Sequence, residues 1–197
     1  MPATATSMIS RRAFLTNGGK LSIIGFSALA VGVGGLAGRA RAAEEPKETK
    51  DPDTLNDMLG REHQAVATYQ IGADSGLLKQ PGLNIALLFQ SHHKAHRDSL
   101  SDAVKKAGGE PVPAMSTPEY MTKLNANALK SQNDVLEMAL KMELDAANAY
   151  INVVSVFQNR DFAKLASRII ADDVMHWTAL ASTLAQPLPA NGLTFGA

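Results

Sequence analysis

The sequence contains no cysteine among its 197 residues. A chain without thiols gains nothing from disulfides, and it cannot hold an iron–sulfur cluster or a thiolate-bound zinc ion, because both use cysteine sulfur. Any metal that this protein binds must therefore be held by histidine and carboxylate side chains.

The sequence also lacks any extended run of alternating apolar and polar residues, the pattern of a half-buried β-strand. Apolar residues recur instead at steps of three and four in four segments, which is the pattern of amphipathic helices. These segments cover 54–75, 83–106, 132–158 and 161–184. The sequence therefore predicts an all-α protein with four long helices.

The connection between the second and third predicted helices is long. A Gly- and Pro-rich break covers 107–113, and Ser116-Thr117-Pro118-Glu119 is typical of the cap and first turn of a short helix. A long crossover lets the third helix run parallel to the second. We expect one four-helix bundle over 54–186, followed by a C-terminal tail over 187–197.

The first 42 residues have the features of a twin-arginine signal peptide. The pair Arg11-Arg12 precedes an uncharged segment over 21–38, and a small-x-small cleavage site covers 39–42. We therefore expect a mature chain that starts at Ala43, a linker over 43–53, and a periplasmic or otherwise exported protein. The alternative is an uncleaved membrane anchor, although 21–38 includes five glycines and is barely long enough to span a bilayer.

Cleavage would change the charge of the chain. Residues 1–42 contain five basic and no acidic side chains, so the mature chain carries 14 basic and 19 acidic residues, a net charge of −5. Such a chain has no electrostatic attraction to nucleic acid or anionic lipid. We expect neither as a partner, and no stable membrane insertion after cleavage.

The most informative feature is a repeat about 80 residues apart. The first half of the repeat pairs Glu62-x-x-Ala65-x-x-x-Tyr69 with Glu143-x-x-Ala146-x-x-x-Tyr150. The second half pairs His93-x-x-His96-x-x-x-Leu100 with Asp173-x-x-His176-x-x-x-Leu180. A helical hairpin has been duplicated, with oxygen and nitrogen ligands kept on the inward faces.

Six of these side chains are candidate metal ligands, since they occupy apolar-series positions on all four helices. They are Glu62, His93, His96, Glu143, Asp173 and His176. Residues three apart lie on one helical face, so each i,i+3 pair can point at the same site. Three carboxylates in an apolar core are costly without compensation, and a pair of divalent cations would supply it. The pattern predicts a dinuclear metal site.

The sequence leaves open which of two neighbouring residues is the ligand on each of two helices, and what the two tyrosines do. His92 and His96 have the i,i+4 spacing of a zinc-binding pair, and Asp172 competes with Asp173. The repeat favours His93 and Asp173, because these two align with each other. Tyr69 and Tyr150 are either core aromatics whose hydroxyls need a partner or hydrogen-bond donors to a ligand.

The pattern resembles the ferritin-like superfamily of di-iron and di-manganese proteins, in which two helices each supply a Glu and two each supply Glu-x-x-His. Glu62, His96, Glu143 and His176 match this pattern, whereas Asp173 and His93 each stand where Glu is usual.

The resemblance implies a ferritin-like bundle that binds two divalent metal ions, iron in first place and manganese as an alternative. It also implies oxidoreductase chemistry with O2 or peroxide, as in a ferroxidase, peroxidase or catalase-like protein, and allows a homodimer. The alternative is a periplasmic metal-binding carrier without turnover, which the nitrogen donor of His93 favours.

Overall fold

The computed structural model describes residues 50–196. The predicted signal peptide and residues 43–49 of the predicted linker lie outside the described residues. The elements are α1 (Asp51–Asp74), α2 (Gly82–Lys106), α3 (Thr117–Lys123), a 3-10 turn η1 (Ala126–Ala128), α4 (Gln132–Val154) and α5 (Arg160–Thr183). Residues 50–196 contain no strand and no helix long and apolar enough to cross a membrane, and the all-α prediction is confirmed.

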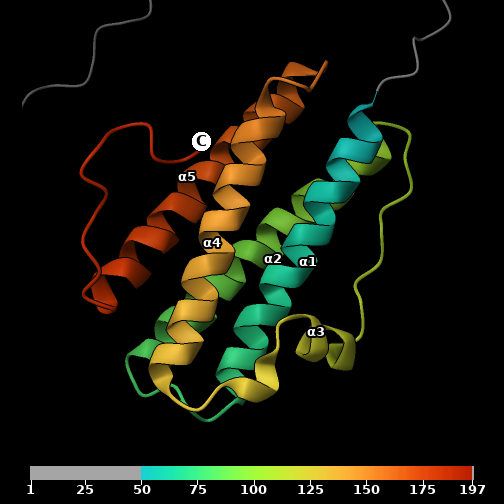
Figure 1. The fold of residues 1–197 in the computed structure, drawn as a ribbon. Helices are drawn as coiled ribbons and strands as arrows, with labels where there is room; N and C mark the ends of the chain where they lie inside the picture. The colour runs from blue at the N-terminus through green and yellow to red at the C-terminus, as the bar shows by residue number, and fades with distance from the viewer. Residues whose placement is uncertain (1–49, 197) are drawn as a thin grey trace, which may run out of the picture. The chain divides into compact units, whose positions relative to one another are not determined.

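The four long helices form a bundle of two antiparallel hairpins, α1–α2 and α4–α5. The connection from α2 runs back along the length of the bundle and passes through α3 before α4 begins (Figure 1). As a result α4 runs parallel to α2, as the long crossover predicted. The expected cap of the short helix is also present, because Ser116 and Glu119 form a capping box at the start of α3.

Two helix boundaries differ from the prediction by more than one residue. α1 starts at Asp51, inside the predicted linker, because Pro52 suits the first turn of a helix and the Asp51 carboxylate is itself buried. The Asp51 oxygens accept hydrogen bonds from the backbone N–H groups of Gln158 and Asn159, at 3.0 Å each. α4 ends at Val154 instead of 158, since the following residues form the turn in which Asn159 caps α5.

The apolar core consists of two main clusters at opposite ends of the bundle. One includes Leu55, Leu59, Leu100 and Ile169, and the other includes Tyr69, Phe89, Leu136 and Leu180. The six candidate ligands lie between these clusters along the four helices. Packed apolar side chains on both sides therefore shield them from water.

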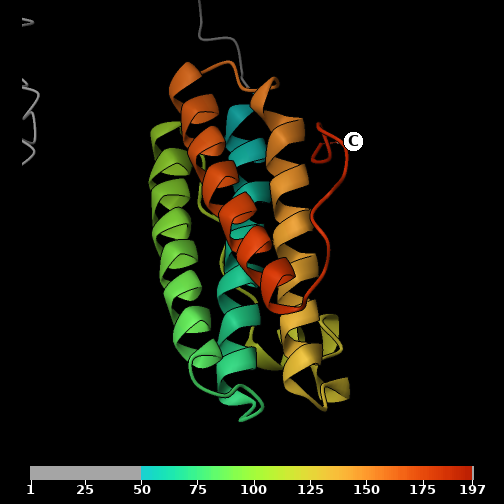
Figure 2. The ribbon, with the colours of Figure 1, turned by 90° about the vertical axis from the view of Figure 1, so that its left-hand side faces the viewer.

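One apolar residue of the second helix lies away from the core. The helical period that places His93 and His96 inward also predicts an inward Ile85, but Ile85 is 39% exposed, and Ala86 is buried in its place. Figure 2 shows the reason: α5 lies beside α2 at its own N-terminal end and leans towards α4 at its C-terminal end. The first turns of α2 consequently have no helix packed over Ile85.

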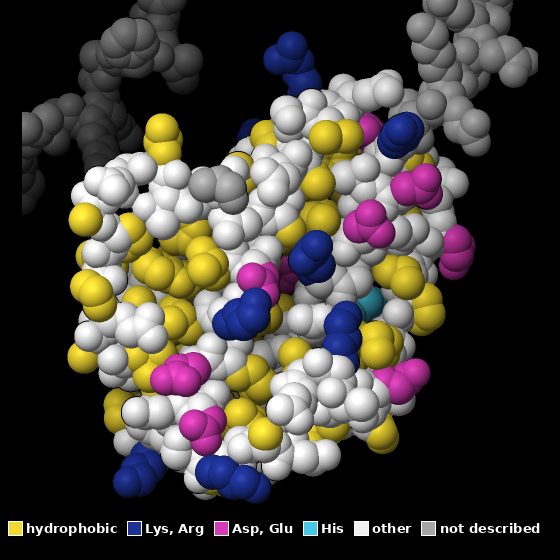
Figure 3. All heavy atoms as spheres, in the orientation of Figure 1, with side chains coloured by type: hydrophobic (Ala, Val, Ile, Leu, Met, Phe, Trp, Pro, Cys, Tyr) yellow, Lys and Arg dark blue, Asp and Glu magenta, His cyan; other side chains and the backbone are white. Residues whose placement is uncertain are grey.

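The C-terminal tail folds back over α4 and α5. The ring of Phe195 packs edge-on against Trp177 with centroids 5.2 Å apart, and the Gly196 N–H donates to Asn148 Oδ1 at 2.7 Å. Apolar side chains gather on this part of the surface, whereas acidic and basic side chains are interspersed over α1 and α4 (Figure 3).

Candidate metal centre

The structure brings all six candidate ligands together in the middle of the bundle. His96 is the most exposed of the six, at 8%. Their donor atoms form two groups, within each of which the atoms lie within 4.8 Å of one another. One group contains Glu62, His93 and His96, and the other contains His93, Glu143, Asp173 and His176. The two groups share His93, so this ring lies at the centre of the cluster.

His93 connects the two halves of the cluster through its two ring nitrogens. Nδ1 lies 2.9 Å from Glu62 Oε2, and Nε2 lies 3.1 Å from Glu143 Oε1. Burial lowers the pKa of His93, but the hydrogen bonds and charges of Glu143 and Glu62 outweigh it and raise that pKa well above its ordinary value. The imidazole therefore binds a proton and compensates two buried carboxylates.

The same contacts that raise the pKa of His93 lower the pKa values of these two carboxylates. Burial raises the pKa of Glu62, but the hydrogen bond to His93 and the nearby His96 ring lower it to about 2. Burial likewise opposes ionisation of Glu143, and the neighbouring His176 and His93 rings bring its pKa below the ordinary value. Both glutamates are thus ionised in a dry core, as metal ligands must be.

Asp173 behaves differently, because its oxygens find no donor among residues 50–196. Burial, together with the charges of Glu62 and Glu143, raises the pKa of Asp173 well above its ordinary value. Three further buried atoms in the described chain also lack a hydrogen-bond partner: His96 Nδ1, Glu143 Oε2 and His176 Nδ1. Buried polar atoms are nearly always paired. All of these unpaired atoms belong to the candidate ligands, and their oxygen and nitrogen chemistry suits iron, manganese or zinc.

Two half-buried residues orient the outer imidazoles. His96 Nε2 lies 3.0 Å from Asp172 Oδ2, and His176 Nε2 lies 2.9 Å from His92 Nδ1. The remaining nitrogen of each ring faces inward, with His96 Nδ1 3.6 Å from Glu62 Oε2. Histidine ligands of metals commonly hold their second nitrogen in this way, which fixes the ring orientation.

His92 and Asp172 therefore have a role of their own, whereas the sequence pattern offered them only as alternatives to His93 and Asp173. A signal was present: the two residues occupy equivalent positions in the repeat, each directly before an aligned candidate ligand. His93, and not His92, lies at the centre of the cluster.

The two tyrosines of the repeat hold the glutamates of the opposite hairpin. Tyr69 on α1 donates its hydroxyl to Glu143 Oε1, and Tyr150 on α4 donates to Glu62 Oε1, each at 2.5 Å. Burial and then the neighbouring carboxylate charge raise the pKa of both hydroxyls, so they remain protonated donors. These reciprocal bonds fix the carboxylates and join the two hairpins.

We expect metal to stabilise the protein more at about pH 8 than at about pH 6, because His93 and Asp173 bind protons that metal must displace. In metal-free protein, the raised pKa of His93 contributes stability that is complete below its unfolded pKa and is lost as pH rises. The raised pKa of Asp173 likewise makes folding less favourable as pH rises above its unfolded value. Melting curves with Mn(II) and with chelator across this range measure the difference. A metal-induced shift that shrinks as the pH rises would contradict the prediction.

The comparisons with known proteins agree with this fold. The family model described as a ferritin-like domain matches residues 50–186. A conserved hypothetical protein from Mycobacterium tuberculosis is 21% identical, with a TM-score of 0.57 over 68% of this chain and 96% of that one. A dodecameric thioferritin, the bacterioferritin-related protein from Bacteroides fragilis, is 17% identical, with a TM-score of 0.55 over 68% of this chain and 83% of that one.

No curated protein matches the chain. At these identities the solved structures support the fold alone. The family match, by contrast, spans all four helices that supply the candidate ligands. This chain belongs to the ferritin-like domain family.

Proposed function

We propose that this chain is an exported ferritin-like protein that binds two divalent metal ions and carries out redox chemistry with O2 or peroxide. Iron is the first choice for both positions, and manganese is the alternative. The observation that carries the proposal is the set of unpaired buried oxygen and nitrogen atoms, all of which belong to four of the six candidate ligands. Within residues 50–196 these atoms have no hydrogen-bond partner, and bound metal ions would supply a partner.

The two ligand groups assign a role to each residue. Glu62 and His96 would hold one ion, while Glu143, Asp173 and His176 would hold the other. His93 lies between the two positions and offers one nitrogen to each side. The three carboxylates, once all are ionised, nearly balance the charge of two divalent cations, which explains why an apolar bundle can contain them.

A pair of Fe(II) ions held by these residues would supply the two electrons that, with two protons, reduce O2 to hydrogen peroxide. The protein's part is to position and shield. Tyr69 and Tyr150 hold the carboxylates, Asp172 and His92 orient the imidazoles, and the two apolar clusters limit access of water. Such fixed polar groups in a dry site need little reorganisation during reaction.

A metal carrier without turnover is the second candidate. The observation in its favour is the central His93, whose nitrogen donors suit zinc or copper better than a bridging carboxylate would. The two candidates differ in whether bound metal reacts with an oxidant.

Metal content tests the proposal. We expect the mature protein, purified from the periplasm without added metal, to contain about two iron or manganese ions per chain. The variant Glu62→Ala/Glu143→Ala should contain none, because each ion loses a carboxylate ligand. The matched control is Asp57→Ala/Glu137→Ala, which removes exposed carboxylates from the same two helices and should leave the metal content unchanged.

The metal-loaded protein should then be mixed with O2 and, separately, with hydrogen peroxide while the absorbance of the metal site is followed. Oxidation of the bound metal by O2 or by hydrogen peroxide supports the redox proposal. One zinc or copper ion per chain, inert to both oxidants, would support the carrier instead. Absence of metal from both the wild type and the double variant would refute both candidates.

A further inference from the structure

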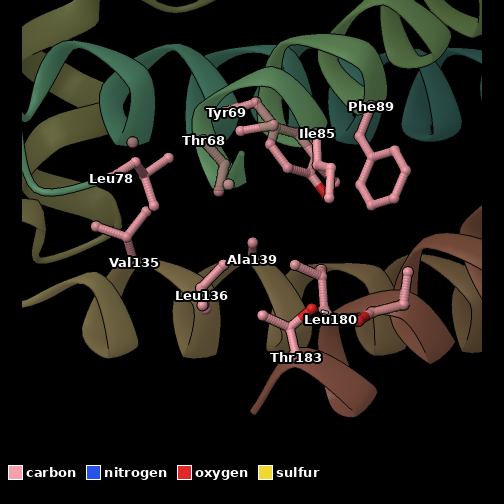
Figure 4. Close-up of a pocket in the computed structure, with 14 residues that line it drawn as sticks. Thr68, Tyr69, Leu78, Ile85, Phe89, Val135, Leu136, Ala139, Leu180 and Thr183 are labelled. Carbon is pink, nitrogen blue, oxygen red and sulfur yellow. Dashed lines mark hydrogen bonds between the residues drawn. The ribbon is translucent and has the colours of Figure 1, made fainter. Parts of the chain in front are cut away.

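A narrow cavity lies between the two hairpins, directly beside the metal centre. Its volume is about 30 Å³. Figure 4 shows Tyr69, Ile85 and Phe89 of the first hairpin facing Leu136, Ala139 and Leu180 of the second hairpin across it. On this measure a cavity needs roughly 10–15 Å³ to hold one water molecule, so there is room for a diatomic molecule.

Two side chains separate the cavity from the candidate ligands. Tyr69 donates to Glu143, and its ring stacks on His93 with centroids 5.6 Å apart. Phe89 stacks on His176 with centroids 4.0 Å apart. A molecule in the cavity would therefore lie one aromatic ring away from three of the six ligands.

The cavity offers a guest almost no free hydrogen-bond donor. Its lining includes three hydroxyl groups, and each already donates its proton elsewhere. Thr68 donates to the Gln64 carbonyl, Thr183 donates to the Ala179 carbonyl, and Tyr69 donates to Glu143. No hydroxyl donor is left for a polar guest, so the lining suits an apolar molecule better than a polar one.

The outer end of the cavity reaches the surface where α2 and α5 diverge. Ile85 of α2 is 39% exposed, and Ala179 and Thr183 of α5 are also exposed. A guest could therefore enter from solvent between these helices and stop at Tyr69 and Phe89.

A second depression between the same helices differs in chemistry. It has a volume of about 220 Å³, and its polar lining includes His92, His96, Arg168 and Asp172. It reaches the imidazole of His96, which Asp172 holds. Ions and hydrogen peroxide suit this polar groove, whereas an apolar gas suits the cavity beside Tyr69.

We propose that the cavity between Tyr69, Phe89 and Ala139 binds dioxygen and delivers it to the metal centre. This inference rests on the proposed redox function and names the oxidant's binding site. It assigns the apolar cavity to O2 and leaves the polar groove to ions and peroxide. Delivery itself breaks no bond, since the molecule only moves from solvent to a position beside the ligands.

Xenon, an apolar probe, tests the cavity without any reaction. Crystals of the wild-type protein pressurised with xenon should show a bound atom between Tyr69 and Ala139. Ala139→Leu, which fills the cavity from α4, should abolish this site. Ala103→Leu is the matched control, since Ala103 is similarly buried but belongs to the cluster at the other end of the bundle. Absence of xenon from the wild type would overturn the proposal.

Rapid mixing tests the delivery. With iron bound, Ala139→Leu should slow oxidation by O2 several-fold while oxidation by hydrogen peroxide keeps its rate. Ala86→Leu fills the same cavity from α2, and it serves if Ala139→Leu does not fold. An unchanged O2 rate in a variant that has lost the xenon site would overturn the delivery.

The two proposals fail separately. If the wild-type protein binds no iron, or bound iron reacts with neither oxidant, the proposed redox function fails, and the xenon result alone decides whether the cavity takes apolar guests. If bound iron reacts with peroxide but not with O2, the redox function stands and the dioxygen site is overturned.

Discussion

Removing bound metal from the mature protein should lower its free energy of unfolding by about 4 kcal/mol, when the metal had been present at about a thousandfold its dissociation constant. The physical reason is the cluster of Glu62, Glu143 and Asp173, which lie close together in a core with one imidazolium to compensate them. Metal ions bind this folded cluster and have no comparable site in the unfolded chain. Urea unfolding before and after dialysis against a chelator measures the loss.

The control is the Asp57→Ala/Glu137→Ala variant, which keeps the cluster and should lose the same amount on metal removal. The Glu62→Ala/Glu143→Ala variant should unfold at the same urea concentration with and without chelator. If the wild type were equally insensitive, the cluster would contribute nothing through metal. The chain would then be a structural bundle, and the proposed function would be wrong.

Replacing the central histidine should have a similarly large effect. We expect His93→Leu to destabilise metal-free protein by about 3–5 kcal/mol, the usual cost of leaving a buried charge without its partner. His93 is fully buried, and its two nitrogens face Glu62 and Glu143. Leucine fills a similar volume but leaves both carboxylates without a cation. Urea unfolding in chelator at neutral pH measures the difference from the wild type.

A charge-free background separates electrostatics from packing. In Glu62→Gln/Glu143→Gln the carboxylates are neutral, so His93→Leu should cost much less there than in the wild type. The difference between the two costs is the coupling between the ring and the carboxylates. An equal cost in both backgrounds would show that His93 acts through its shape alone, and the charge compensation argued above would be incorrect.

Much of the fold follows from local patterns in the sequence. The 3.6-residue period of a helix places residues three and four apart on one face, so the apolar series also determined which face carries Glu62, Glu143 and Asp173. The long Gly- and Pro-rich connection predicted the parallel course of α2 and α4. The repeat selected His93 and Asp173 over His92 and Asp172, and the structure places both selected residues in the buried cluster, with His93 at its centre. The signal peptide and export stay predictions.

The contacts between the hairpins depended on the tertiary structure. Tyr69 and Glu143 are 74 residues apart, and Tyr150 and Glu62 are 88 residues apart, so no local pattern could pair them. The way α5 packs against α2 likewise decides three features. They are the pairing of His92 with His176, the exposure of Ile85 and the cavity beside Tyr69. The sequence by itself determined which side chains face inward, because that depends on one helix at a time. Only the packing of four helices decided which of them meet, because that depends on the crossing angles between helices.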